Sequence, residues 1–103
     1  PSRPYAVWHD RAVFHFLTDA ADREQYLDVL RKALQPRGHF LLATFGEDGP
    51  ERCSGLQVQR YSVEMLKVLL EPDFRLRAFE IEEHRTPAGA PQESLYSWWQ
   101  AEA

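Results

Sequence analysis

A histidine, an aspartate and an arginine stand side by side near the start of this sequence, as His9, Asp10 and Arg11. They follow a short apolar segment, 5–8, whose composition favours a buried strand over a helix. Open α/β sheets bind ligands at the carboxyl ends of their strands, so the three side chains are predicted to form a catalytic wall, with His9 as the base where a bound molecule must lose a proton. The alternative is structural: Asp10 caps the next turn and Arg11 pairs with a carboxylate.

A second group of reactive side chains, Arg52, Cys53 and Ser54, lies in a long connection between 46 and 61 that has no clear period. Connections of this length in compact domains are more often functional than idle. The alternative is a flexible loop with an incidental thiol. A covalent role for Cys53 is disfavoured, because the sequence offers no histidine arrangement matched to it.

The remaining chemical groups have simpler structural interpretations. His15 lies between two phenylalanines and is expected to be a satisfied, half-buried core residue. The four histidines are scattered without the spacing of metal ligands, so no metal site is predicted. Tyr96, Trp98 and Trp99 are interpreted as an aromatic strand that covers the sheet, because no basic neighbours support stacking on nucleic-acid bases.

The bulk composition is that of one globular domain. The 103 residues suit a single domain, and 44% hydrophobic with 27% charged residues is typical of a folded chain. A formal net charge of -4 without a basic run argues against nucleic-acid binding. Cys53 is the only cysteine, so no internal disulfide can form. Without a membrane-length or signal-like stretch, a cytoplasmic protein with no membrane partner is expected, and the start at Pro1 suggests a processed or cut chain.

The elements that would position these side chains begin with a parallel crossover. After the first strand, 11–17 is expected to form one or two helical turns. Asp19 is a good N-cap for a longer helix with apolar residues at three- and four-residue spacing, and Pro36 with Gly38 is expected to stop it. The continuous apolar run 40–45 predicts a strand covered on both faces. Strand, helix and buried strand together predict an α/β fold.

The second half of the sequence predicts a further helix and an antiparallel pair of strands. Ser62 can cap a helix with four apolar residues, which Pro72 should end. The apolar alternation then slips near Phe79, which predicts a strand with a bulge. After a turn region at 86–91, the aromatic segment 95–99 is predicted to pair antiparallel with that strand.

This order of elements resembles the second half of the class I S-adenosylmethionine-dependent methyltransferase fold. Three stretches carry the resemblance: YAVWHDRAVFHFL at 5–17 is similar to the fourth strand and following loop of a bacterial branch of these enzymes, LQPRGH at 34–39 resembles the turn before the fifth strand, and GPERCSGL at 49–56 resembles the loop after it. The resemblance implies a single domain, 1–103, holding part of a doubly wound sheet. About four strands, a C-terminal antiparallel hairpin and two to three helices are expected.

The resemblance also implies a cofactor and roles for the site residues. S-adenosylmethionine would be the cofactor of the complete enzyme, whose catalysis is mainly positioning because the donor is already primed to leave. The loop at 49–56 would cover the acceptor pocket. The residues expected to bind the substrate are Phe14, Arg52, Cys53 and Ser54.

The sequence departs from the family pattern at its glycines. They fall at positions 38, 46, 49, 55 and 89, and no Gly-x-Gly-x-Gly pattern follows a strand. The half that holds most of the cofactor is therefore expected to be missing. The leading hypothesis is the C-terminal portion of an enzyme that methylates a small-molecule acceptor. One alternative is a non-catalytic fragment in which the missing half leaves two features exposed, the edge of Tyr5–Trp8 and the sheet face that the missing helices would cover. Such a fragment would fold as a homo-oligomer through the edge of Tyr5–Trp8. Another alternative is a free-standing α/β module with its own ligand.

Overall fold

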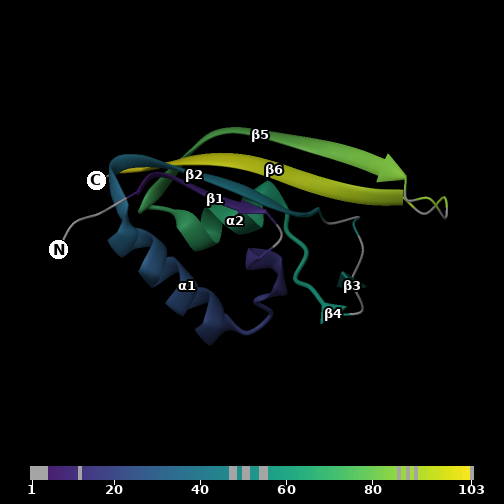
Figure 1. Cartoon of the computed structure of the whole chain (residues 1–103). Coiled ribbons are helices and arrows are strands. Elements are labelled where there is room, and N and C mark those ends of the chain that lie inside the picture. The colour runs from purple at the N-terminus through teal and green to yellow at the C-terminus, as the bar shows by residue number, and fades with distance from the viewer. Residues whose placement is uncertain are drawn as a thin grey trace.

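The computed structural model of the chain describes residues 5–11, 13–46, 49, 52–53, 56–85, 87, 89 and 91–102, with the backbone alone at positions 52, 53, 84 and 91. Its main feature is a mixed four-stranded sheet in the order β1-β2-β6-β5 (Figure 1). The strands of this sheet are β1 (Tyr5–Arg11), β2 (Leu34–Phe45), β5 (Phe74–Arg85) and β6 (Pro91–Ala101). The other elements are the 3-10 turn η1 (Phe14–Phe16), the helices α1 (Ala20–Ala33) and α2 (Val63–Leu70), and the short strands β3 (Arg52–Cys53) and β4 (Leu56–Gln57).

The first half forms the predicted parallel crossover. β1 pairs in parallel with β2, with His9 opposite Leu41, and α1 connects the two strands. Among the described strands β1 has no second neighbour, so its other edge is open. The strand continues to Arg11, beyond the predicted segment 5–8, and the helical turns expected over 11–17 reduce to the single turn of η1.

Helix α1 begins where predicted and ends earlier. Asp19 caps it, because its side chain accepts a hydrogen bond at 2.8 Å from the backbone N–H two residues later. The helix ends at Ala33, since Leu34 already has an extended backbone with φ -83° and ψ 134°. Proline disfavours helical geometry in the residue before it, which moves the end of the helix ahead of Pro36. The helix thus ends slightly ahead of the expected stop, and Pro36 and Gly38 lie inside β2 and not in a turn.

The second half contains the predicted helix and antiparallel pair, although β6 is longer than the predicted segment 95–99. Ser62 caps α2 by accepting a hydrogen bond at 3.2 Å from the backbone N–H of Met65, and the helix ends before Pro72. β5 and β6 pair antiparallel, and the predicted irregularity lies between Leu76 and Ala78, slightly ahead of the expected position near Phe79. None of the described helices is long and apolar enough to cross a bilayer.

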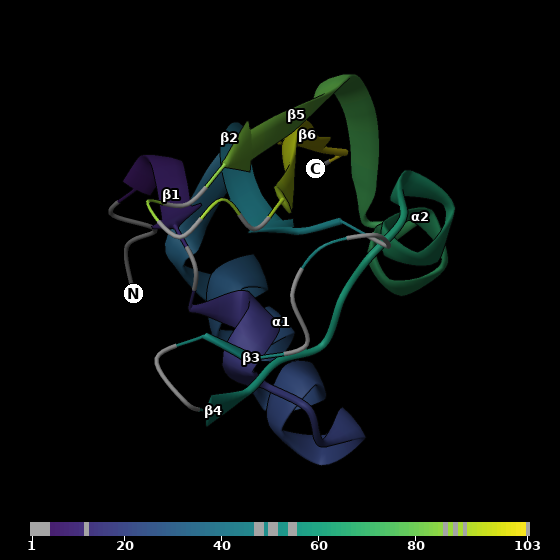
Figure 2. The same ribbon diagram turned by 90° about the vertical axis from the view of Figure 1, so that its right-hand side faces the viewer.

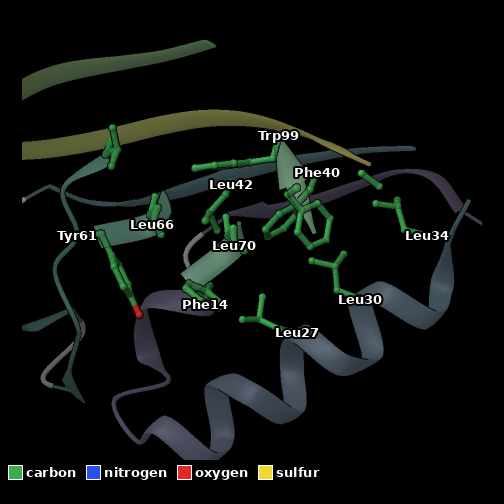
Figure 3. Packing of buried hydrophobic residues seen from close by; sticks show 13 residues of the cluster. Phe14, Leu27, Leu30, Leu34, Phe40, Leu42, Tyr61, Leu66, Leu70 and Trp99 are labelled. Carbon is green, nitrogen blue, oxygen red and sulfur yellow. The ribbon is translucent and has the colours of Figure 1, made fainter. Parts of the chain in front are cut away.

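The hydrophobic core lies between the sheet and one layer of helices. α1 and α2 lie on the same side of the sheet, and the short strands β3 and β4 lie on that side as well (Figures 1 and 2). Figure 3 shows Leu27 and Leu30 of α1 directed toward Phe40 of β2 and Phe14 of η1, and all four side chains are fully buried. Burying a side chain of this size contributes about 1.5 to 3 kcal/mol, so this layer holds the domain together.

The opposite face of the sheet is bare in the described part of the chain. Side chains of β2 alternate between the two faces, so Leu42 is buried while Leu41 is only partly buried. No described helix or loop covers this second face, where Val7 is 50% and Trp98 38% exposed. The prediction that the run 40–45 is covered on both faces is therefore wrong for this chain, because both helices pack on one side.

Candidate functional site

The geometry of β1 separates the three residues predicted as a catalytic wall. Successive side chains of a strand point to opposite faces, so His9 and Arg11 lie on the bare face and Asp10 on the helix face. Exposure agrees with this alternation, because Asp10 is buried whereas His9 and Arg11 are exposed. All three lie at the carboxyl end of β1, as expected, but the structure does not bring them into one cluster.

Asp10 anchors the turn that follows β1. One carboxylate oxygen accepts hydrogen bonds from the backbone N–H groups of Val13 at 2.9 Å and Phe14 at 3.2 Å, and the other accepts from Phe14 at 3.1 Å and from the Tyr26 hydroxyl. Tyr26 in turn accepts a hydrogen bond from Trp8 Nε1 at 3.0 Å. Burial and the contact with Asp10 raise the pKa of Tyr26, so its hydroxyl stays protonated and keeps donating. Asp10 thus matches the capping alternative and positions η1.

His15 lies on η1, just beyond this anchor, and is 1% exposed. Its ring packs against Phe16 and Phe45, with centroid distances of 4.7 and 4.8 Å. Neither ring nitrogen has a hydrogen-bond partner among the described residues. Burial lowers the pKa of His15 from its ordinary 6.5, an effect that the charge of Asp10 partly opposes, so the imidazole is neutral at neutral pH. The expectation of a half-buried histidine is wrong, and no described residue satisfies its ring nitrogens as expected.

His15 lines a cavity of about 190 Å³ at the carboxyl ends of β1 and β2, here called the polar cavity. Arg11 and Thr44 line it as well, and the Thr44 hydroxyl is buried without a hydrogen-bond partner in the described chain. No hydrogen bond or ion pair joins the Arg11 side chain to another described residue. The other lining residues are Ala43, Phe45, Gln92, Ser94 and Tyr96. A cavity with unpaired polar groups and a cation can hold a small polar molecule.

A larger, apolar hollow adjoins the polar cavity on the bare face. Its volume is about 360 Å³, and His9, Leu41 and Trp98 are among the residues that line it. Ala43 and Tyr96 line both the polar cavity and the apolar hollow, so the two spaces lie side by side. His9 therefore belongs to the apolar hollow, not to the polar cavity.

The residues predicted to bind a substrate are described only in part. Phe14 is fully buried, with its ring 5.5 Å from that of Tyr61, so it belongs to the hydrophobic core. The side chains of Arg52 and Cys53, and the whole of Ser54, lie outside the described residues. Within the described residues, no group of three or more His, Cys, Asp or Glu side chains could hold a metal ion.

Two polar residues of the cavity are missed by sequence reasoning: His15 is interpreted there as structural, and Thr44 is not singled out. The available signal is position. Thr44 lies at the carboxyl end of the run 40–45 and His15 lies in the turn after β1, and open α/β sheets gather ligand-binding groups at such places. His15 and Thr44 line the same cavity because segments distant in the sequence come into contact, and the spacing of residues does not reveal such contacts.

Comparison with known proteins gives matches at the level of structure. No protein-family model matches the chain, and no curated protein matches it. A solved SAM-dependent methyltransferase from Methanosarcina mazei aligns with a TM-score of 0.69 at 15% identity, covering 92% of this chain and 57% of its own length. A SAM-dependent methyltransferase from Anabaena variabilis aligns with a TM-score of 0.69 at 17% identity, covering 90% of this chain and 48% of its own.

A third solved structure covers this chain completely. It is the Burkholderia thailandensis 1,6-didemethyltoxoflavin-N1-methyltransferase with bound 1,6-didemethyltoxoflavin and S-adenosylhomocysteine, which aligns with a TM-score of 0.74 at 18% identity over 100% of this chain and 46% of its own. The chain thus spans about half the length of the solved structures it matches. At these identities the likeness establishes the fold: this chain has the α/β, Rossmann-like fold found in S-adenosylmethionine-dependent methyltransferases.

Proposed function

We propose that this chain is the C-terminal, acceptor-side portion of an S-adenosylmethionine-dependent methyltransferase that acts on a small molecule. The observation that carries the proposal is the fold match, in which methyltransferases from three organisms cover 90 to 100% of this chain with about half of their own length. The polar cavity supports it, because open α/β sheets bind ligands at the carboxyl ends of their strands.

We propose that the described residues do not by themselves hold S-adenosylmethionine. A dinucleotide or similar cofactor on such a sheet needs glycines that let the backbone approach it closely. Gly46 and Gly49 offer no such approach, because a Cβ added at either position would collide with Glu93. We therefore propose that the methyl donor binds mainly to a further segment, placed against the open edge of β1 and the bare face of the sheet.

The small-molecule acceptor is proposed to lie against the bare face. Arg11 and His9 line the two neighbouring spaces there and are proposed to contact the acceptor. Asp10 is proposed to act indirectly, by holding η1 in place. Arg52, Cys53 and Ser54 are proposed to reach the acceptor around the carboxyl ends of the strands, because β3 and β4 lie on the helix side of the sheet. Phe14 is proposed to support η1 from the core.

The test joins this chain to the part of the Burkholderia thailandensis methyltransferase that it does not cover. The expected result is saturable binding of S-adenosylhomocysteine by the fusion, measured by isothermal titration calorimetry. That part of the enzyme alone is the control and is expected to bind more weakly, because one wall of its site is missing. A fusion that unfolds cooperatively on heating but binds no S-adenosylhomocysteine would show that the proposal is wrong.

A second candidate function is a non-catalytic fragment that folds as a homo-oligomer. The open edge of β1 and the apolar side chains beside it, Tyr5 at 49% and Val7 at 50% exposure, favour this alternative, because unpaired strand edges readily pair with another chain. Light scattering on the isolated chain tests it. A closed dimer, together with a fusion that binds no S-adenosylhomocysteine, would support the fragment, whereas a stable monomer would contradict it.

A further inference from the structure

We propose that the polar cavity binds a small planar molecule that carries one negative charge and an N–H or O–H hydrogen-bond donor. This inference deepens the proposed function and rests on it for the identity of the ligand, which would be the methyl acceptor. Binding itself requires no methyl donor, so it can be tested on this chain alone.

The first argument is that buried polar groups in the cavity have no partner. Both ring nitrogens of His15 and the hydroxyl of Thr44 are buried without a hydrogen bond to any described residue, and both residues line the polar cavity. Leaving buried groups unpaired costs more than an ordinary hydrogen bond gains, so these atoms favour a partner inside the cavity. A neutral imidazole has one accepting nitrogen. That nitrogen selects a ligand that donates an N–H or O–H.

The second argument is the charge of the cavity. Arg11 carries the only formal charge among the described lining residues, because His15 is neutral at neutral pH. No ion pair with another described residue occupies its guanidinium. The planar fork of arginine matches a carboxylate in a two-point geometry. The cavity therefore complements a ligand with one negative charge.

The third argument is the shape and size of the cavity. The rings of His15 and Phe45 are tilted by 32° at 4.8 Å, and Tyr96 adds a third ring to the lining. Aromatic walls of this kind favour a flat ligand. The volume of about 190 Å³ is below the roughly 300 to 1,000 Å³ typical of sites for drug-sized ligands. A single ring with few substituents is the matching size.

The experiment titrates the 103-residue chain with three probes and follows the ring nitrogens of His15 by nitrogen-15 NMR. 4-Hydroxybenzoate has the ring, the charge and the donor, benzoate lacks the donor, and phenol lacks the charge. We expect 4-hydroxybenzoate to bind saturably with a Kd of about 1 mM or lower and to shift the His15 signals. Benzoate and phenol should each bind about tenfold more weakly or worse.

Variants assign the effect to single side chains. Arg11→Gln should weaken 4-hydroxybenzoate binding about tenfold and leave phenol unaffected. Arg75→Gln is the matched control, because it removes the same charge from an exposed site at the other end of β5 and β6, where Arg75 pairs with Glu102. His15→Phe keeps the ring, removes both nitrogens and should reduce 4-hydroxybenzoate binding to the level of benzoate. If that variant does not fold, the nitrogen signals of the wild-type chain still test the role of His15.

Three outcomes would overturn the inference. The first is that no probe shifts the His15 nitrogens at about 10 mM, which would mean that water alone fills the cavity. The second is equal affinity for phenol and 4-hydroxybenzoate. The third is an equal loss of binding in the Arg75→Gln control. None of these outcomes affects the fusion test, because that test measures binding of S-adenosylhomocysteine. Failure of the ligand assignment can therefore be distinguished from failure of the proposed function.

Discussion

Tyr26 connects two parts of the site that are far apart in the sequence. Its hydroxyl donates to Asp10, at the end of β1, and accepts from Trp8 Nε1 at 3.0 Å. Ring contacts extend the same group, because Tyr26 lies edge-on to Trp8 and to Phe14. The hydroxyl therefore ties α1 to β1 and, through Asp10, to the turn that carries His15.

The first prediction is that Tyr26→Phe destabilises the fold. The change keeps the ring packing but leaves an Asp10 oxygen and the Trp8 indole N–H without this partner, which should lower the free energy of unfolding by about 1 to 3 kcal/mol. Urea unfolding followed by tryptophan fluorescence measures the loss. Tyr5→Phe is the control, because Tyr5 is 49% exposed and should change stability by no more than about 0.5 kcal/mol. Equal effects of the two variants would contradict the role of the Tyr26 hydroxyl.

The second prediction concerns the pH dependence of stability. Burial holds the pKa of His15 below 6.5 in the folded chain, despite the opposing charge of Asp10, whereas the unfolded chain has the ordinary value. The unfolded state therefore takes up the proton first, so the free energy of unfolding should fall as the pH decreases from about 7.5 through 6.5 toward the lowered pKa.

His15→Phe tests this pH dependence, because it removes the titrating group and keeps a ring against Phe45. Urea unfolding at about pH 7.5 and 5.5 should show a smaller decline for this variant than for the wild-type chain. His9→Gln, at an exposed site on β1, should keep the wild-type decline. Parallel declines in the wild-type and His15→Phe chains would contradict the prediction.

At the level of elements, the start of β2 shows what local patterns reveal and what they leave out. The N-cap Asp19, the apolar spacing of α1 and the proline after it predict a helix and its approximate end. They do not predict that the strand begins at once, at Leu34. That outcome depends on Arg37, whose φ of 61° lies in the left-handed region, and on the close packing of Gly38, neither of which a residue pattern encodes.

The third prediction follows from Gly38. A Cβ added there would lie 2.8 Å from the backbone oxygen of Gln35 and 2.8 Å from Cγ of Leu34, so the backbone would have to shift. Gly38→Ala should therefore destabilise the fold by about 1 to 3 kcal/mol in thermal or urea unfolding. Gln35→Ala, at an exposed neighbouring position, should change stability by no more than about 0.5 kcal/mol. A neutral Gly38→Ala would show that this segment packs less tightly than described.

At the scale of the whole molecule, the α/β class, the parallel crossover and the final antiparallel pair could be predicted from sequence. Each follows from local patterns, such as the caps Asp19 and Ser62 and the alternation in β5. The apolar run 40–45 alone does not predict the bare face, because the same run fits a strand covered on one face or on two. The bare face follows instead from the expected absence of the helices that would cover it. The polar cavity could not be predicted from the sequence either, because it depends on the contact between His15 and Phe45, which are far apart in the chain.

The last prediction concerns association of the isolated chain. An open strand edge beside a bare apolar face favours contact with another chain, so we expect concentration-dependent self-association between about 10 and 100 µM in light scattering. The double variant Val7→Lys, Trp98→Lys places charges on this face and should shift the chain toward monomer. Val68→Lys is the control, because Val68 is 82% exposed on α2, on the other side of the sheet.

The form of the association distinguishes the two candidate functions. A closed dimer that Val7→Lys, Trp98→Lys disrupts would favour the homo-oligomeric fragment, because two copies would then satisfy each other's β1 edge. Open-ended association that disappears in the fusion with the methyltransferase segment would favour the acceptor-side portion, because that segment would cover the same face. A wild-type chain that stays monomeric at the highest concentration would contradict this prediction, since the bare face and the β1 edge would then be stable in water without a partner.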